Sequence, residues 1–97
     1  MEKKPVIRKY IRFHGWVQGV GFRYRAIRAA QHYGATGWVM NEYDGTVSME
    51  IQGTESQIDQ VIQAIQQGKW IKIEKMDVKI IPVDESEYTF GPGGERW

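Results

Sequence analysis

The chain of 97 residues contains no cysteine, only two histidines and only three prolines. The missing cysteines exclude disulfide bonds, thiolate metal sites and a cysteine nucleophile. The histidines, His14 and His32, form no cluster with acidic residues at metal-ligand spacing, so no metal site is expected. No serine lies in the strand–turn–helix context of a nucleophile elbow. If the chain is an enzyme, we expect it to work by anion stabilisation and a positioned water, with neither a metal nor a covalent intermediate.

The sequence also lacks long apolar segments. No apolar run approaches the roughly 18 residues that a membrane-spanning helix needs, and no apolar signal segment follows residues 1–5. We therefore expect a cytoplasmic protein with no membrane partner. One domain is expected over residues 1–97, because a chain of this length has no room for two cores. The polar or glycine-rich ends, residues 1–6 and about 91–97, are expected to be loosely ordered.

Acidic residues are scarce at the start of the chain. Residues 1–28 hold eight lysines and arginines and one acid, so this segment carries +7. The remaining residues hold five basic and eleven acidic side chains, which gives −6 and a net charge of +1. A basic region of this kind attracts anionic ligands. The alternative is that most of these charges simply face solvent on a strand and a helix.

Strand and helix patterns alternate along the chain. Polar and apolar residues alternate with period two in the strand segments, whereas apolar stripes recur at helical spacing in two others. An Asp-Gly pair at Asp44 predicts a hairpin, and Thr54-x-x-Gln57 is a capping box that begins a helix. The predicted elements are strand 7–14, helix 22–33 ended by Gly34, strand 36–41, strand 46–52, a helix from about 55 to Gly68, and strand 70–83.

Two features interrupt this pattern near the C-terminus. The apolar phase changes within the strand 70–83, which predicts a bulge or bend near Lys75. The tail 85–97 is polar and rich in glycine, and we expect it to hold at most one short strand around residues 88–90.

The predicted order is βαββαβ. Each helix offers one apolar stripe and the sheet offers one apolar face, so the economical packing is a two-layer α+β sandwich. We therefore predict a ferredoxin-like fold with an antiparallel sheet that carries both helices on one face. Such a fold hosts many functions, so the function depends on the site residues.

The segment 15–23 lies where the first strand ends and the first helix begins. Gly19 and Gly21 let the backbone curl, so that N–H groups from about Gln18 to Phe22 can converge on one oxyanion at the positive end of the helix. Arg23 stands where the helix dipole repels a cation, which favours an anion between them. The segment therefore predicts a phosphate-binding loop, although an ordinary glycine-rich turn is the open alternative. It lacks the Lys-Ser/Thr ending of a nucleotide P-loop and the spacing of a dinucleotide fingerprint.

Asn41 is the second candidate. It ends the strand 36–41 immediately before the Asp-Gly hairpin. Asparagine is common at the start of a turn, which is the simpler interpretation. The functional interpretation is that its amide holds a water molecule beside the phosphate-binding loop.

Two motifs resemble signatures of the acylphosphatase family. Gly15-x-Val17-Gln18-Gly19-Val20-x-Phe22-Arg23 is similar to the first signature, G-x-V-Q-G-V-x-F-R. A later segment resembles the second signature of the family, with the pattern Gly37-Trp38-Val39-Met40-Asn41-x3-Gly45-x-Val47-x5-Gly53. The two motifs occur in the family's order, and the resemblance covers about residues 7–83. The tail does not obviously supply the final edge strand of the family.

The resemblance implies the hydrolysis of acyl phosphates to a carboxylate and inorganic phosphate, by a ferredoxin-like enzyme without a cofactor. By motif position, Arg23 matches the phosphate-binding arginine and Asn41 matches the asparagine that positions water. The implied partners are a small acyl phosphate and inorganic phosphate, with no nucleic acid, and a monomer is expected. The phosphate-binding residues implied are Gly15, Gln18, Gly19, Val20, Gly21, Phe22 and Arg23.

Two other functions remain open at this stage. Acylphosphatase-like domains also occur within larger proteins of hydrogenase maturation, so the chain can instead be a binding module without turnover, although its short length argues mildly against a fragment. RNA binding is the third interpretation, because the fold and the basic N-terminal region permit it. The strand 46–52 lacks the stacking aromatics of an RNA-recognition module, which disfavours that interpretation.

Overall fold

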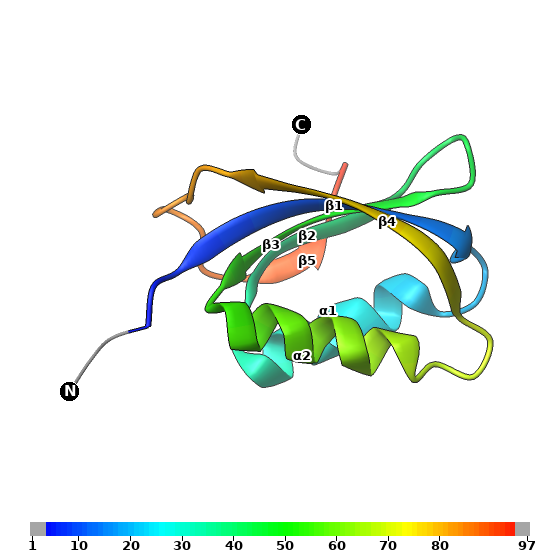
Figure 1. Cartoon of the computed structure of the whole chain (residues 1–97), viewed down its shortest axis with the longest axis horizontal. Coiled ribbons are helices and arrows are strands. Elements are labelled where there is room, and N and C mark those ends of the chain that lie inside the picture. Colours follow the sequence, from blue (N-terminus) through cyan, green and yellow to red (C-terminus); the bar gives the residue numbers. More distant parts are fainter. Residues whose placement is uncertain (1–3, 95–97) are drawn as a thin grey trace.

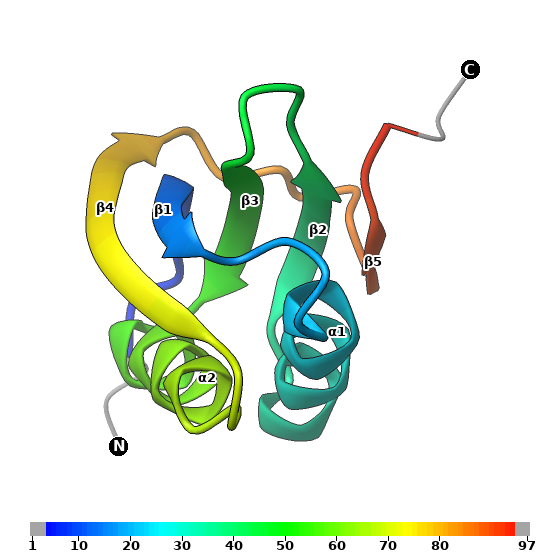
Figure 2. The same ribbon diagram turned by 90° about the vertical axis from the view of Figure 1, so that its right-hand side faces the viewer.

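The computed structural model describes residues 4–94. Its five strands form one sheet in the order β4-β1-β3-β2-β5, and both helices cover the same face of it (Figures 1 and 2). This arrangement confirms the two-layer, ferredoxin-like α+β sandwich. The elements in chain order are β1 (Ile7–Trp16), α1 (Phe22–Tyr33), β2 (Thr36–Asn41), β3 (Val47–Gly53), α2 (Glu55–Gln66), β4 (Lys72–Ile81) and β5 (Phe90–Pro92).

The core lies between the sheet and the helices. β1 and β3 are the central strands and pair antiparallel, with Ile11 opposite Met49 and Phe13 opposite Val47. The rings of Phe13 and Phe22 lie 4.9 Å apart between centroids, which fixes the start of α1 against β1. Apolar contacts of this kind hold the two layers together because they remove side chains from water. The buried helix side chains are Phe22, Ala26, Ala29 and Ala30 of α1 and Ile58, Val61 and Ile65 of α2.

The sheet is mixed, so the prediction of an antiparallel sheet is wrong at one edge. β5 pairs parallel with β2, with Gly37 opposite Phe90. The chain leaves β4 at one edge of the sheet, crosses to the other edge and reverses its direction, which makes β5 run with β2 (Figure 2). The tail thus supplies a final edge strand, two residues later than the predicted 88–90.

The ends of the chain were expected to be loosely ordered. Residues 91 and 92 nevertheless belong to β5, and Gly93 N–H donates to Val39 O at 2.8 Å. Residues 1–3 and 95–97 lie outside the described residues.

β4 contains the irregularity that was predicted near Lys75. His14 pairs with Lys75, but the next residue of β1, Gly15, pairs with Ile73, so Glu74 has no residue opposite it. An extra residue of this kind is a β-bulge, and it shifts the side-chain alternation by one position. It explains why the apolar positions change phase within the strand.

The helix ends follow the predicted signals. Gly34 ends α1 in the left-handed conformation, with φ of 80°, and Thr54 and Gln57 form the capping box of α2. Gly68 directly follows Gln67, the C-cap of α2, but unlike Gly34 it has no positive φ. It is small for a different reason, because an added Cβ would lie 2.5 Å from the side chain of Ile71.

A polar cluster on the open face holds the chain segment between β4 and β5. Arg8 is only 4% exposed, and its guanidinium lies 2.8 Å from a carboxylate oxygen of Glu50 and 2.7 Å from one of Glu87. Gln52 exchanges two hydrogen bonds with the backbone of Asp84. Burial is the largest single effect on the pKa of Arg8 and lowers it. The hydrogen bonds and charges of Glu87 and Glu50 together outweigh burial, so the pKa is raised above its ordinary value. The cluster thus joins the crossing segment to the two central strands.

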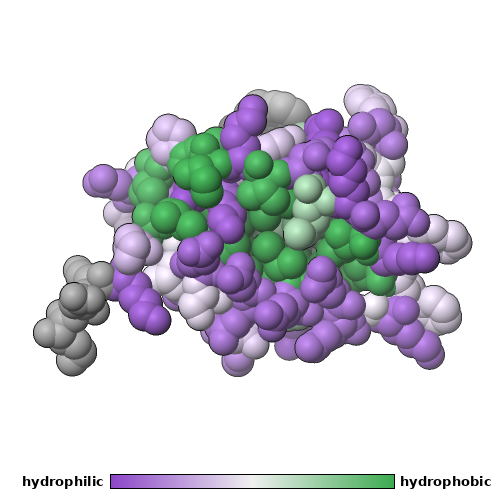
Figure 3. Space-filling view, in the orientation of Figure 1, coloured by the Kyte–Doolittle hydropathy of each residue, from purple (hydrophilic) through white to green (hydrophobic). Residues whose placement is uncertain are grey.

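The edge strand β4 leaves an apolar row in contact with water. Met76, Val78 and Ile80 are 38%, 50% and 63% exposed, and Figure 3 shows apolar side chains on the surface over this strand. They share the side of the sheet on which Ile11 and Phe13 lie, as the pairing of β1 with β4 requires. The helices cover the buried side chains of the inner strands, and this outer row on β4 is left partly uncovered.

Candidate active site

The predicted phosphate-binding loop connects β1 to α1 (Figure 2). Val17 and Phe22 are buried at its two ends, whereas Gly19 and Gly21 between them are exposed. Both glycines have positive φ, 72° and 83°, and an added Cβ at either would meet nothing within 4 Å. Glycine is therefore required here for the left-handed backbone and not for lack of space. The loop is therefore an exposed stretch of backbone between two buried side chains.

The backbone N–H groups of this loop have no hydrogen-bond acceptor among the described residues. Within residues 4–94, the N–H groups of residues 18–22 donate to no protein acceptor. Gly21 is the N-cap of α1, so no side chain caps this helix, and its first turn holds no acidic residue. In contrast, α2 closes its own N-terminus with a capping box. Unpaired donors and the positive end of a helix dipole are the features that typically bind an anion, so the predicted role of this segment stays a prediction with a physical basis.

Arg23 is the second residue of α1 and is exposed. Among the described residues its side chain has no hydrogen bond and no ion pair. A guanidinium with all of its donors available binds two oxygens of a phosphate at once. The position therefore suits an anion that lies on the loop, and the binding role of Arg23 stays a prediction.

Gln18 joins the loop to the hairpin between β2 and β3. Its side-chain amide donates to the carbonyl oxygens of Glu42 and Thr46, at 2.7 and 2.9 Å. Asn41 immediately precedes Glu42, is exposed, and its side chain has no partner within the described residues. The structure therefore brings Asn41's end of β2 next to the phosphate-binding loop. Sequence spacing alone left this proximity open.

The hairpin itself is held rigidly from both sides. Thr46 donates two hydrogen bonds to the Asp44 carboxylate, through its backbone N–H at 3.0 Å and its hydroxyl at 2.6 Å. These bonds lower the pKa of Asp44 below its ordinary value. Arg12 of β1 approaches Glu42 to 3.7 Å, and Ser48 donates a hydrogen bond to the same carboxylate. The sequence showed Arg12 and Ser48 only as polar members of alternating strands, so their role in holding the hairpin was missed.

The other predicted loop residues divide into two groups. Gly15 lies within β1, and an added Cβ there would lie 2.3 Å from the carbonyl oxygen of Lys72. Its small size is therefore explained by the pairing of β1 with β4, and its part in phosphate binding stays a prediction. Val20 packs partly against the core, and the side chain of Phe22 is buried. Only the backbone of these two residues is placed to face an anion.

Replacing Gln18 with alanine is expected to lower turnover about tenfold, because the loop and the Asn41 end of β2 lose the amide that joins them. We also expect the free energy of unfolding to fall by about 1–3 kcal/mol, because two carbonyl acceptors lose their donor. Phosphate-release kinetics and urea denaturation measure the two effects. Gln63→Ala, at an exposed position of α2, is the matched control. Unchanged turnover in Gln18→Ala would contradict the positioning role.

The residues that the structure describes include no group of three or more His, Asp or Glu side chains that could hold a metal ion. They also include no helix long and apolar enough to cross a membrane. His14 lies at the surface, 2.8 Å from a carboxylate oxygen of Asp77 on β4, and this hydrogen bond lowers the pKa of Asp77. This pair belongs to β1 and β4 and not to the loop 18–22.

Three comparisons with known proteins all find acylphosphatases. The family model for acylphosphatase matches residues 9–91. An acylphosphatase of Bifidobacterium longum is 36% identical over 88 residues, which make up 89% of this chain and 91% of that protein. The crystal structure of acylphosphatase from Bacillus subtilis superimposes with a TM-score of 0.80 at 30% identity, covering 89% of this chain and 97% of that one.

The same fold also occurs as part of a larger protein. The crystal structure of full-length HypF in its phosphate- and nucleotide-bound form matches 96% of this chain with a TM-score of 0.83 at 29% identity. The match spans only 12% of the HypF chain. With a family model across most of its length and relatives above 30% identity, this chain belongs to the acylphosphatase family.

Proposed function

We propose that this chain hydrolyses acyl phosphates by holding the phosphoryl group on the loop 18–22 and Arg23 while Asn41 orients the attacking water. The family gives the reaction, the hydrolysis of a carboxyl–phosphate bond. The observation that carries the mechanism is the uncapped start of α1, where consecutive N–H groups have no acceptor among residues 4–94. An oxyanion bound there receives both the backbone donors and the arginine fork.

The chemistry of the substrate explains why so few residues suffice. The leaving group is a carboxylate, whose conjugate acid has a pKa near ~4, so its departure needs no proton from a general acid. Phosphoryl transfer depends mainly on aligning the reactants and spreading the charge of the equatorial oxygens. The loop N–H groups and Arg23 supply that charge stabilisation, and they need no reorganisation during the reaction.

We propose that Asn41, at the end of β2 beside the loop, completes the arrangement. A carboxamide can accept a hydrogen bond from water through its oxygen and donate one through its nitrogen. The water oxygen attacks phosphorus as the carboxylate leaves, and the products are the carboxylate and inorganic phosphate. The carboxamide fixes the direction of attack, which contributes by orientation and not by proton transfer. We propose that no metal takes part, since the described residues offer no cluster to hold one.

The remaining parts of the proposal concern partners and location. The open face of the sheet carries Glu42, Glu50 and Glu87 beside its arginines, and these carboxylates disfavour a polyanion such as RNA. Three lysines and a bulge on the edge strand β4 disfavour pairing with a second sheet, which supports a monomer. We propose a cytoplasmic monomer whose partners are an acyl phosphate and inorganic phosphate.

Binding of inorganic phosphate directly tests the proposed phosphate cradle, which consists of the N–H groups of residues 18–22 and the side chain of Arg23. We expect phosphate to shift the backbone amide resonances of residues 18–22 far more than those at the start of α2, whose capping box already occupies its donors. Two-dimensional NMR titration of the parent and of Arg23→Ala measures the shifts and the affinity. Phosphate binding without any turnover of an acyl phosphate would favour the non-catalytic binding module instead. Shifts confined to other basic surfaces would contradict the cradle.

A further inference from the structure

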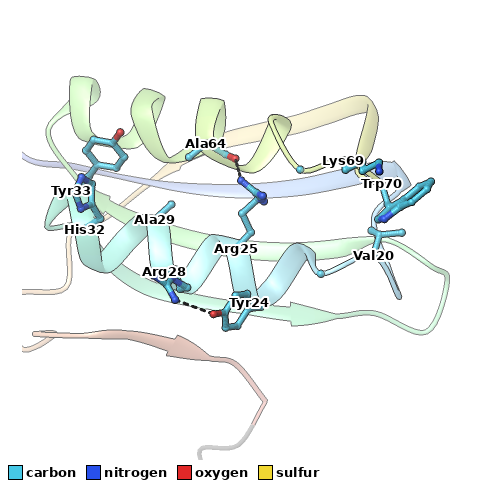
Figure 4. A pocket seen from close by; sticks show the side chains of 12 residues that line it. Val20, Tyr24, Arg25, Arg28, Ala29, His32, Tyr33, Ala64, Lys69 and Trp70 are labelled. Atoms are coloured by element: carbon cyan, nitrogen blue, oxygen red, sulfur yellow. Dashed lines mark hydrogen bonds between the residues drawn. The ribbon is translucent and has the colours of Figure 1, made fainter.

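A groove of about 550 Å³ lies between α1 and the end of α2 (Figure 4). This volume is typical of sites for small molecules. The backbone of Val20 and Gly21 borders one end of the groove, so the groove and the proposed phosphate cradle are neighbours. None of its side chains has a part in the proposed hydrolysis. The proposed hydrolysis therefore does not explain why this groove is present.

The charge of the groove is positive throughout. Arg25, Arg28 and Lys69 line it, and no aspartate or glutamate does. The guanidinium of Arg25 donates to the carbonyl oxygen of Ala64 at 3.2 Å and thereby reaches from α1 to the last turn of α2 (Figure 4). The same carbonyl oxygen also accepts from Gln67 N–H at 3.3 Å, so the Arg25 bond is a second one to the end of α2, and it holds a positive charge in the groove. An anion is the ligand that this lining favours.

Two large aromatic rings stand at the same groove and are mostly in water. Tyr24 is 66% exposed and Trp70 is 67% exposed. Each already holds a cation, with Arg28 at 5.6 Å from the Tyr24 ring centroid and Lys69 at 5.1 Å from the Trp70 centroid. Arg28 also donates to the Tyr24 hydroxyl at 2.9 Å, which fixes the pair. The groove thus offers ring faces and positive charges side by side.

We propose that this groove binds a small molecule that carries both a planar aromatic ring and an acidic group, a carboxylate or a phosphate ester. The ring stacks on Trp70, and the acidic group pairs with Lys69 beside that ring or with Arg28. A ligand that carries both the ring and the charge binds more tightly than either group alone, because its translational and rotational freedom is lost only once. This site is separate from the cradle, which binds the phosphoryl group of the substrate.

A matched set of probes separates the two contributions. We expect 1-naphthoate and 1-naphthyl phosphate to bind, and 1-naphthol, which has the ring without the charge, to bind at least tenfold more weakly. Isothermal titration measures the affinities, and the indole N–H resonance of Trp70, identified by its loss in Trp70→Ala, reports the location. All titrations are repeated with Arg23→Ala, which is expected to weaken anion binding in the cradle and to leave the groove intact. Whichever naphthyl anion binds more tightly identifies the acidic group that the groove prefers.

Two pairs of variants give the controls. Trp70→Ala is expected to weaken binding of the naphthyl anions about tenfold, the change that loss of one stacked ring produces. Trp16→Ala removes an equally exposed tryptophan outside the groove and is expected to change the affinity less than twofold. Lys69→Ala is expected to weaken binding severalfold, whereas Lys79→Ala, which removes the same charge from β4, leaves it unchanged.

Three results would overturn the proposal. The first is that Arg23→Ala weakens binding of the naphthyl anions as much as it weakens binding of inorganic phosphate, which would place them in the cradle. The second is that 1-naphthol binds as tightly as 1-naphthoate, which would leave the positive charges without a role. The third is that Trp70→Ala and Trp16→Ala have equal effects, since binding would then lie elsewhere on the surface. Hydrolysis of acyl phosphates is measured separately and stands whichever result is obtained.

Discussion

Replacing Arg23 with alanine is expected to lower the turnover of an acyl phosphate at least ~10³-fold, by analogy with the loss of an oxyanion donor. The side chain has no structural partner among the described residues, so its removal changes little in the fold. The loss therefore measures its contact with the phosphoryl group. Steady-state phosphate release from benzoyl phosphate gives kcat and KM, and the inhibition constant of inorganic phosphate is expected to rise as well.

Two further variants sharpen the test of Arg23. Arg23→Lys keeps the charge but lacks the planar fork, so we expect it to recover only part of the activity. Lys79→Ala removes a positive charge from β4, away from the loop, and should leave turnover unchanged. If Arg23→Ala hydrolysed benzoyl phosphate at the parent rate, the proposed role of the arginine would be wrong.

Replacing Asn41 with alanine is expected to reduce kcat roughly 10²-fold or more, because the attacking water loses the group that orients it. Phosphate affinity should change little, since Asn41 does not belong to the cradle. This split between kcat and phosphate inhibition distinguishes Asn41 from Arg23, for which both quantities change. Tyr43→Ala, at a fully exposed position of the same hairpin, is the matched control. Equal loss of turnover and of phosphate affinity in Asn41→Ala would indicate a binding role instead.

The central elements of the fold were predictable because their signals are local. Period-two and helical patterns, the capping box at Thr54 and the cap at Gly34 depend on residues that are neighbours in the sequence. The bulge near Lys75 was also predictable, since the extra residue shifts the visible alternation of β4. The family motifs added the site residues, whose types and spacing are specific.

The features that were missed depend on partners far away in the chain. β5 is three residues long and contains glycine and proline, so it has no pattern of its own and forms by pairing with β2. Arg8 lies in the polar phase of β1 and is nevertheless buried, because Glu87 reaches it from the crossing segment. The side chain of Gln18 binds carbonyls of the hairpin, which no spacing rule predicts. Tertiary contacts decide each of these cases.

Hydrolysis of benzoyl phosphate by the purified parent chain in excess EDTA tests the central claim most directly. We expect phosphate release at the same rate with and without the chelator, and competitive inhibition by inorganic phosphate, because the proposed mechanism uses only the loop, Arg23, Asn41 and water. No release above the uncatalysed rate, or a loss of activity in EDTA that added metal restores, would contradict the account.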